Sequence, residues 1–326
     1  MVVYTGGSAS VKYGVESLSA FGTAVTGTIP FGLNQKVTNL SITNNRLNFN
    51  KLGQVETTAF AYGQQAGSLG LSFVYDDLES HKIFESIYGA ISTDKFPSTL
   101  AEGQASPRVG SLTTDVSVQM GANYIKRVLS GCVVNSISMS TSIGEPLNGS
   151  IDMTFGKEVS TGMLVSSDTI TKQSSGLQAG EPFTFAHGSF KVSNGSSMIP
   201  IGEIQDADVN WTQNAELLYG IGSHYAQSAF KKALDITGKF KTSFKNETLA
   251  THILDQAKDT SNSIELGDVS GVAIELNFVS GTKSMKIELS GVAIGDYSIS
   301  GIEPVEPIFE DISWKAKTAR ITVDVS

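Results

Sequence analysis

Several residue types that carry chemistry are scarce in this chain of 326 residues. Cys132 is the only cysteine, which excludes an intrachain disulfide, a CxxC redox pair and a zinc site built on cysteines. The four histidines, His81, His187, His224 and His252, have no second histidine or carboxylate at metal-ligand spacing. We therefore expect no metal site and no other cofactor. We place His81 and His252 at the surface or rim of two predicted helices.

Charge and long apolar runs are also scarce. Charged residues make up 17% of the chain, with 32 acids against 23 bases and a formal net charge of −9. An acidic surface disfavours stable binding of nucleic acid, because phosphate contacts need basic residues. No apolar run approaches the roughly 18 residues that a membrane span requires, and the start MVVYTGGSAS lacks the pattern of a signal peptide. These features predict a soluble protein made in the cytoplasm.

Motifs for catalysis are missing as well. There is no G-x-S-x-G nucleophile motif, and Cys132 lies in an alternating apolar stretch, where a buried and inert thiol is expected. Glu145 and Glu306 both precede a proline and recur at matching positions, which favours a shared turn over an acid pair. The sequence therefore predicts no catalytic residues and no enzyme.

The most informative feature that is present is an internal repeat. The motif Ile29-Pro30-Phe31-Gly32 returns as Ile199-Pro200-Ile201-Gly202, Leu129-Ser130-Gly131 as Leu289-Ser290-Gly291, and Glu145-Pro146 as Glu306-Pro307. At a constant offset of 169 (209 − 40), Leu40, Ile42, Thr43, Asn45, Leu52 and Gly53 match Val209, Trp211, Thr212, Asn214, Ile221 and Gly222. Matches in one order at nearly one offset predict two copies of one domain.

The repeat divides the chain. We predict a first domain at 1–160, a linker rich in Ser, Thr and Gly at 161–181, and a second domain at 182–326. The offset falls to 160 or 161 after the middle of each copy, so we expect the first copy to carry a longer surface loop there.

Apolar residues alternate with polar ones in the later part of each copy, which indicates antiparallel strands with one buried face. One amphipathic helix is predicted in the middle of each copy. Asp77 is the expected cap of the first helix, with Ile83, Phe84 and Ile87 on its apolar side; Asn246 is the cap of the second, with Leu249, Ile253, Leu254 and Ala257. The predicted fold is mainly β: two tandem antiparallel β-sandwich or barrel domains, each flanked by one α-helix.

The order of segments resembles a known family. Each copy has an early strand such as NLSITNN, a glycine-flanked segment such as GQVETTAFAYGQQAGS, a strand SLGLSFVYDD, a helix, and a Glu-Pro turn before a last strand such as DISWKAKTA. This layout resembles the tail tube, or major tail, proteins of tailed bacteriophages over essentially the whole chain. The resemblance implies a structural virion protein that polymerises into stacked rings, forming a conduit for DNA ejection.

The resemblance also implies partners. Six tube domains form a ring in that family, so three chains with two domains each would give a pseudo-sixfold ring; a ring of six chains is the alternative. Other tail proteins, such as a tape measure, a terminator or a sheath, are the expected partners, together with transient, non-specific passage of DNA. The expected location is the virion tail, after synthesis in the host cytoplasm, without membrane association. An acidic pore would let DNA slide.

Two other functions fit the composition. A tandem β-sandwich surface-layer or adhesin-like binding protein would share the Ser/Thr/Gly-rich strands and the acidic charge, and an enzyme with a jelly-roll fold is the third alternative. Self-polymerisation distinguishes the first alternative from a tube protein, and a pocket with paired carboxylates or histidines would distinguish the second.

Two glycine-bounded segments, 53–68 and 222–235, are the predicted sites of contact between stacked rings. Their aromatic residues are Phe60 and Tyr62 in the first segment and Tyr225 and Phe230 in the second. We expect loops too polar to form a core of their own, so these aromatics need a partner surface to bury them.

Overall fold

The computed structural model describes residues 9–17, 19–49, 59–88, 111–120, 123–159, 164–165, 180–193, 198–201, 203–243, 272–301 and 307–324. The first half contains β1 (Ala9–Val15), β2 (Ile29–Pro30), β3 (Leu33–Phe49), β4 (Ala59–Val74), η2 (Ser80–Phe84), α1 (Glu85–Tyr88), β5 (Leu112–Met120), β6 (Asn123–Ser142), β7 (Asn148–Val159) and β8 (Leu164–Val165). The second contains η3 (Phe185–His187), β9 (Gly188–Ser193), β10 (Met198–Pro200), β11 (Ile204–Thr212), β12 (Glu216–Tyr219), β13 (Ala226–Phe230), β14 (Asp235–Ser243), β15 (Ala273–Ser280), β16 (Lys283–Ser300) and β17 (Phe309–Asp324).

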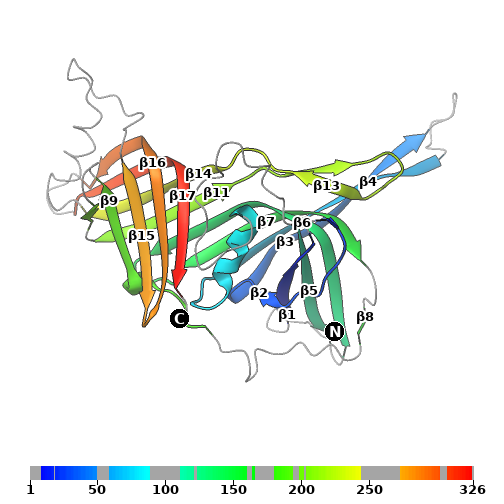
Figure 1. Ribbon diagram of the computed structural model, residues 1–326, viewed down its shortest axis with the longest axis horizontal. Helices are drawn as coiled ribbons and strands as arrows, with labels where there is room; N and C mark the ends of the chain where they lie inside the picture. Colours follow the sequence, from blue (N-terminus) through cyan, green and yellow to red (C-terminus); the bar gives the residue numbers. More distant parts are fainter. Residues whose placement is uncertain are drawn as a thin grey trace, which may run out of the picture.

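Antiparallel strands dominate both halves, so the predicted fold class is confirmed. One sheet runs through the whole described structure in the order β10-β9-β15-β16-β17-β14-β11-β6-β5-β1-β2, and β7, β4 and β3 branch from β6. A separate pair is formed by β12 and β13. Figure 1 shows the two halves as curved sheets on either side of the short helix α1. The two halves are therefore joined edge to edge within one sheet.

The two halves pair their strands in the same order. The first half reads β3-β4-β7-β6-β5-β1-β2, and the second reads β11-β14-β17-β16-β15-β9-β10. The registers agree as well: Leu40 lies opposite Leu69, and Val209 lies opposite Gly238, each pair shifted by 169. Leu40 and Val209 thus occupy corresponding strands.

The Leu-Ser-Gly motif also has one conformation in both halves. Gly131 and Gly291 both have a φ of 63°, a left-handed value that favours glycine. Gly131 lies where β6 shifts its register against β5, and Gly291 directly follows Ser290, the last residue of β16 that pairs with β15. Strand β6 pairs with β5 as far as Cys132 and with β11 from Ser136 onward. Pairing of β6 with both β5 and β11 places the two halves in one sheet.

A single apolar core extends through both halves, and α1 with η2 covers its centre. Ile83, Phe84 and Ile87 are buried, as the apolar stripe predicts. The expected capping residue was wrong by one position. Asp76, not Asp77, accepts the backbone N–H groups of Leu78, Glu79 and Ser80 at 3.1–3.2 Å. The predicted second helix, with Asn246, Leu249, Ile253, Leu254 and Ala257, lies outside the described residues.

Several smaller predictions can be compared with the structure. Glu145 lies in a turn, where its N–H donates to the Ser142 carbonyl at 2.9 Å, so the turn interpretation is confirmed there; Glu306 lies outside the described residues. Cys132 is fully buried, and burial raises the pKa of its thiol to about 12, as expected for an inert thiol. The surface or rim position predicted for His81 was wrong, because His81 in η2 is buried; His252 is not among the described residues.

Candidate assembly surfaces

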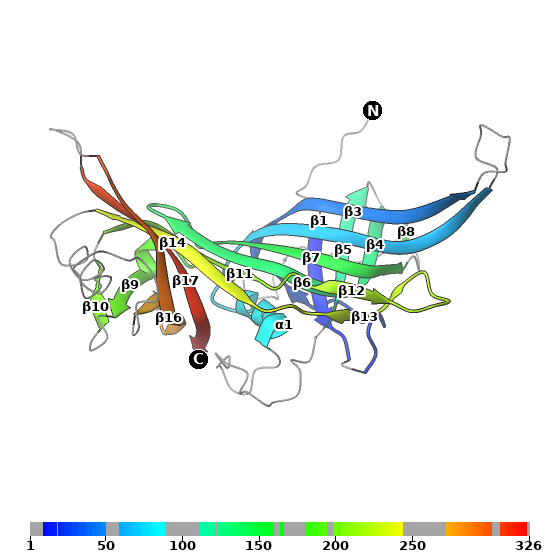
Figure 2. The same ribbon diagram turned by 90° about the horizontal axis from the view of Figure 1, so that it is seen from above.

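Two β-hairpin arms extend from the body of the protein. The first is formed by the distal parts of β3 and β4, residues 43–49 and 59–66, which pair from Asn44 opposite Gln65 to Phe49 opposite Ala59. The second is formed by β12 and β13, in which Glu216 lies opposite Phe230. Figure 2 shows both arms pointing to the same end of the molecule. The described part of the first predicted loop, 59–68, is therefore all strand, and the second, 222–235, contains the strand β13 between two irregular segments.

The sequence-predicted aromatic residues lie on these arms. Phe60 and Tyr62 are on β4, opposite Asn48 and Arg46 in the backbone register. Phe230 ends β13 with 56% of its side chain exposed. Tyr225 lies in the turn before β13, and the Lys157 ammonium is 5.2 Å from the centre of its ring. The four residues thus come from two different arms, and the role of each in inter-ring contact stays a prediction.

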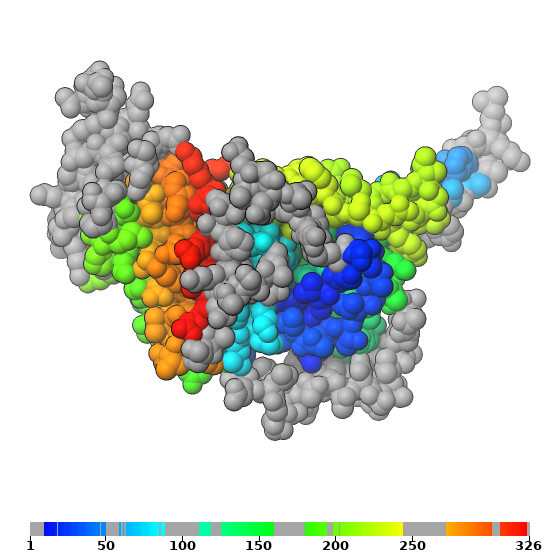
Figure 3. Space-filling view, viewed as in Figure 1, coloured from blue at the N-terminus to red at the C-terminus, as the bar shows by residue number. Residues whose placement is uncertain are grey.

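Exposed apolar side chains are concentrated on the same arms. Leu47 and Phe49 on the first arm and Leu218 and Ile221 on the second are all exposed. Sequence reasoning missed these four, although one signal was present: Ile221 is an apolar residue between two glycines in a turn. Exposed apolar groups gathered on a projection are typical of interaction surfaces. In the space-filling view the second arm, in yellow-green, stands out from the body (Figure 3).

The second arm also contacts the first half of the same chain. The Tyr219 hydroxyl donates to the Gln65 carbonyl at 2.8 Å, and the Gln65 N–H donates to the His224 carbonyl at the same distance. Ala226 is buried against Gly156. A Cβ atom at position 156 would lie 2.8 Å from the Ala226 Cβ, so only glycine leaves room for this contact. One side of the second arm therefore packs against the first half of the chain. The other side, with Leu218 and Phe230, is exposed.

The centre of the molecule is the internal junction, where β6 of the first half pairs with β11 of the second. Ile137 lies opposite Trp211, and Met139 lies opposite Val209. All four side chains are buried. The Phe84 ring from η2 packs edge-on against Trp211, with 4.9 Å between ring centroids. The two halves thus share one core at this junction.

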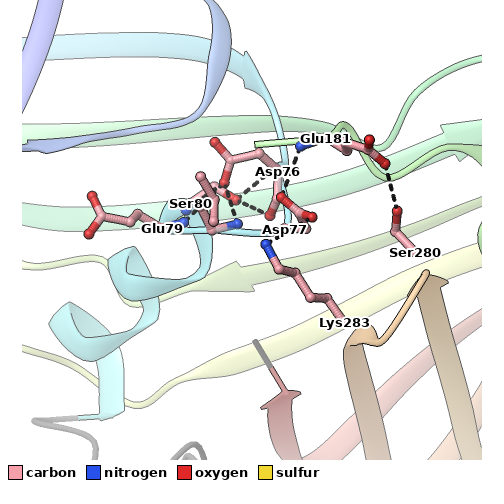
Figure 4. Close-up of polar contacts among 8 residues, drawn as sticks. Asp76, Asp77, Glu79, Ser80, Glu181, Ser280 and Lys283 are labelled. Atoms are coloured by element: carbon pink, nitrogen blue, oxygen red, sulfur yellow. Dashed lines mark hydrogen bonds and ion pairs between the residues drawn. The ribbon is translucent and has the colours of Figure 1, made fainter. Parts of the chain in front are cut away.

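Polar contacts reinforce the connection between the halves (Figure 4). The Asp77 carboxylate accepts the N–H of Glu181 at 2.9 Å and forms an ion pair of 3.2 Å with Lys283 at the start of β16. Buried Lys231, which follows β13, donates to the Ser86 carbonyl of α1. Burial lowers the pKa of Lys231 to about 8. These contacts hold the first helix against strands of the second half.

Among the described residues, two long strands, β3 and β16, have an open edge. Along β3, the described residues pair only with β4 on one side. Along β16, the part from Ala293 to Ser300 pairs only with β17 among the described residues, because β15 ends its pairing at Ser290. Open strand edges present unpaired N–H and C=O groups and are ready to pair with another chain. No sequence signal marked these edges.

The described residues offer little for chemistry. Within them, no group of three or more His, Cys, Asp or Glu side chains is placed to hold a metal ion. No helix among them is long and apolar enough to cross a membrane. The features that the structure brings together are thus strand edges and exposed apolar arms.

Comparisons with known proteins identify a family that fits these surfaces. A family model described as "phage tail tube protein" matches residues 6–316, nearly the whole chain. A search of curated proteins finds no match. The match spans both halves, including the internal junction, the arms and the open edges. The chain therefore belongs to the phage tail tube protein family and is a structural component of the virion tail.

Proposed function

We propose that this protein polymerises into stacked rings that form the tail tube, and that three chains make one ring with pseudo-sixfold symmetry. The observation that carries the proposal is the same strand pairing in the two halves, at the same register. Residues 1–160 and 182–326 would then be two copies of one tube unit, joined by 161–181. A ring of six units would need three chains.

The proposed tube is a passive conduit for DNA, without catalytic activity of its own. The formal net charge of −9 supports passage, because an acidic wall repels phosphate and does not retain it. Synthesis in the host cytoplasm and contacts with other tail proteins, such as a tape measure or terminator, belong to the same proposal.

Negative-stain electron microscopy of the purified chain tests this function. We expect tubes or stacked rings, and native mass spectrometry of isolated rings should give three chains of 34.5 kDa each. Rings of six chains would contradict the three-chain ring but would agree with the formation of a tube. A chain that remains monomeric under all conditions would contradict the tube and favour an adhesin-like binding protein.

We further propose that the arms contact the next ring, through Phe60, Tyr62, Tyr225 and Phe230. The support is the exposure of Tyr225 and Phe230 and of the neighbouring apolar residues on both arms. Changing Phe60 and Phe230 to Asp should block tube growth, because a stacked contact would have to bury two unpaired charges. A matched control is Val279→Asp, since Val279 on β15 is also exposed but lies off the arms.

Electron microscopy reports the tubes, and circular dichroism reports the fold. Tubes of normal length from the Phe60→Asp, Phe230→Asp variant would refute the contact. Loss of the fold together with the tubes would instead place these aromatics in the core of the chain.

A further inference from the structure

Glu16, directly after β1, is a buried carboxylate that hydrogen bonds satisfy without a cation. Its side chain is 2% exposed, and it takes part in none of the ion pairs among the described residues. Its Oε2 accepts the Gly22 N–H at 2.8 Å and the Ser111 hydroxyl at 2.6 Å. Its Oε1 accepts the Thr113 hydroxyl and the Gly131 N–H, both at 2.8 Å. Burying a carboxylate without such partners is strongly unfavourable, so Glu16 and its four donors hold one another in place.

One of these donors belongs to the irregular segment 19–28, here called the strap, which leads from Glu16 to β2. The Gly22 N–H attaches the beginning of the strap to Glu16. Further along, the Val25 N–H donates to the Thr113 hydroxyl at 3.1 Å, and the same hydroxyl donates to Glu16. The strap is therefore held on β5 by one connected set of hydrogen bonds, and Glu16 is its central acceptor.

The strap meets the second arm at Gly156 of β7, here called the seat. Phe21 of the strap packs over Gly131, where a Cβ atom would lie 2.9 Å from its Cε1. A Cβ atom at the seat would lie 3.6 Å from that same Cε1 and 2.8 Å from the Cβ of Ala226 on the second arm. Figure 3 shows the blue beginning of the described chain directly below the yellow-green second arm. The strap and the second arm thus pack on one glycine.

The second half repeats the strands but not this arrangement. At the offset that relates β5 to β15, the residue corresponding to Thr113 is Ala273, which has no hydroxyl. The residue corresponding to the seat Gly156 is Lys317, and its side chain covers the second bulge: a Cβ atom at Gly291 would lie 2.9 Å from the Lys317 Cδ. The shared strand order therefore does not by itself require the hydroxyl or the glycine seat. Both occur in the half on which the second arm lies.

The second arm depends on such support, because a two-stranded hairpin is only marginally stable by itself. Its other contacts with the first half lie close to the seat. Lys157, the next residue of β7, has its ammonium 5.2 Å from the centre of the Tyr225 ring. The Gln65 N–H donates to the His224 carbonyl of the arm at 2.8 Å. An arm that leaves the seat would lose this hydrogen bond, so the Gln65 N–H reports where the arm is.

We propose that Glu16 is a positioning residue for the second arm: it fixes the strap, and the strap fixes the arm through Phe21 at the seat. This inference rests on the proposed function, because the second arm is one of the surfaces proposed to contact the next ring. A hairpin held at one angle loses less conformational freedom on binding than a mobile hairpin does. Fixing the arm before assembly therefore favours the contact that the arm makes.

Amide hydrogen exchange at Gln65 in the dispersed chain tests the positioning. Glu16→Gln replaces one carboxylate oxygen with an NH₂ group, which cannot accept from its two donors. Phe21→Ala removes the ring from the seat and leaves the backbone hydrogen bonds of the strap in place. In both strap variants, exchange at Gln65 should become at least about tenfold faster relative to the amides of β11 at the internal junction, because only the arm is released.

Three controls accompany these variants. Gly156→Ala is the positive control, because its Cβ would displace Ala226 directly while Glu16 stays intact. Val25→Ala shortens a strap side chain that lies over Gly14 and away from the seat, and should change exchange at Gln65 by less than about twofold. Phe21→Met returns a long apolar side chain to the seat and should restore most of the protection that Phe21→Ala loses.

The outcomes separate this proposal from the proposed function. If Gly156→Ala speeds exchange at Gln65 but the two strap variants do not, the positioning proposal is wrong, whether or not tubes form. If the strap variants speed exchange in β11 as much as at Gln65, Glu16 only stabilises the fold, and the proposal is again wrong. Selective release of Gln65 together with slower tube growth, followed by electron microscopy, supports both proposals. Selective release with tube growth at the wild-type rate keeps the positioning and contradicts the arm contact between rings.

Discussion

The internal junction and the outer edges of the sheet are made from corresponding strands but differ in burial. Trp211 and Val209 on β11 are covered by β6 and by Phe84. Their counterparts on β3, Ile42 and Leu40, have β4 on one side and no described strand on the other. The comparison indicates that burial here depends on the neighbour a strand has, more than on the strand's own sequence. The difference in burial predicts measurable differences in stability.

The largest expected effect separates these two positions. Trp211→Ala should lower the free energy of unfolding of the dispersed chain by about 3–5 kcal/mol, because it leaves a cavity in the shared core. Ile42→Ala should cost less than about 1.5 kcal/mol, since the side chain is only half-buried before assembly. Urea unfolding of both variants measures the difference, and equal losses would remove the distinction between junction and edge.

A second, smaller effect sharpens the comparison through pH. Burial lowers the pKa of Lys231 from 10.5 to about 8. Below about pH 8 the lysine is charged in both the folded and unfolded chain, and the folded chain bears the full desolvation cost. Between about pH 8 and 10.5 only the unfolded chain holds the proton, so stability should rise with pH, by roughly 1–3 kcal/mol.

The measurement is the change in unfolding free energy from pH 7 to 10, with Lys231→Met as the control without the titrating group. The position corresponding to Lys231 in the first half is Tyr62, so the first half has no lysine at this place. Parallel pH curves for wild type and Lys231→Met would show that Lys231 is not desolvated there.

The smallest effect compares two corresponding ion pairs. Lys126 lies 3.1 Å from Asp115 in the first half, and Lys286 lies 3.0 Å from Glu275 in the second, where Lys191 also approaches at 2.8 Å. Burial alone would raise the pKa of Glu275, but hydrogen bonds from Lys191 and Lys286 hold it below its usual value. The stabilisation that ionised Glu275 contributes is present at pH values above the pKa that Glu275 has in the unfolded chain. It is lost as the pH falls through the lower pKa that Glu275 has in the folded chain.

Glu275→Gln should therefore cost about 0.5–1 kcal/mol at pH 7, a value reduced by solvent screening, and nothing in strong acid. Asp115→Asn should cost less at pH 7, because Asp115 is paired with one lysine and the Gly27 N–H, whereas Glu275 is paired with two lysines. Thermal melts of both variants at pH 7 and in acid measure this. If Glu275→Gln still lowers the melting temperature in acid, the loss comes from packing rather than from charge.

Much of the fold was predictable from local pattern. Alternation of apolar residues indicates the strands, and the matching motifs place Leu40 and Val209 on corresponding strands. The helix stripe with Ile83 and Phe84 was predictable for the same reason, since periodicity is a local property of the chain. The capping residue was not, because Asp76 and Asp77 are both suitable caps and only backbone geometry selects one.

The candidate surfaces were only partly predictable. The aromatic residues on the arms stand out in the sequence, yet the contacts of Tyr219 with Gln65 and of Tyr225 with Lys157 depend on residues far apart in the chain. The exposure of Phe49 and Leu218 was not predicted. Alternation of apolar and polar residues identifies the apolar face of a strand, but it does not indicate which element packs on that face.

The residue pattern alone is enough to indicate the strands and the repeated motifs, since both are visible as side-chain alternation and matching segments. Tertiary packing places β6 beside β11 and Trp211 against Phe84, and it leaves β3 and β16 with open edges among the described residues. Strand edges pair through backbone groups that every residue has, so the choice of partner leaves no mark in the residue pattern and follows from how the whole chain packs.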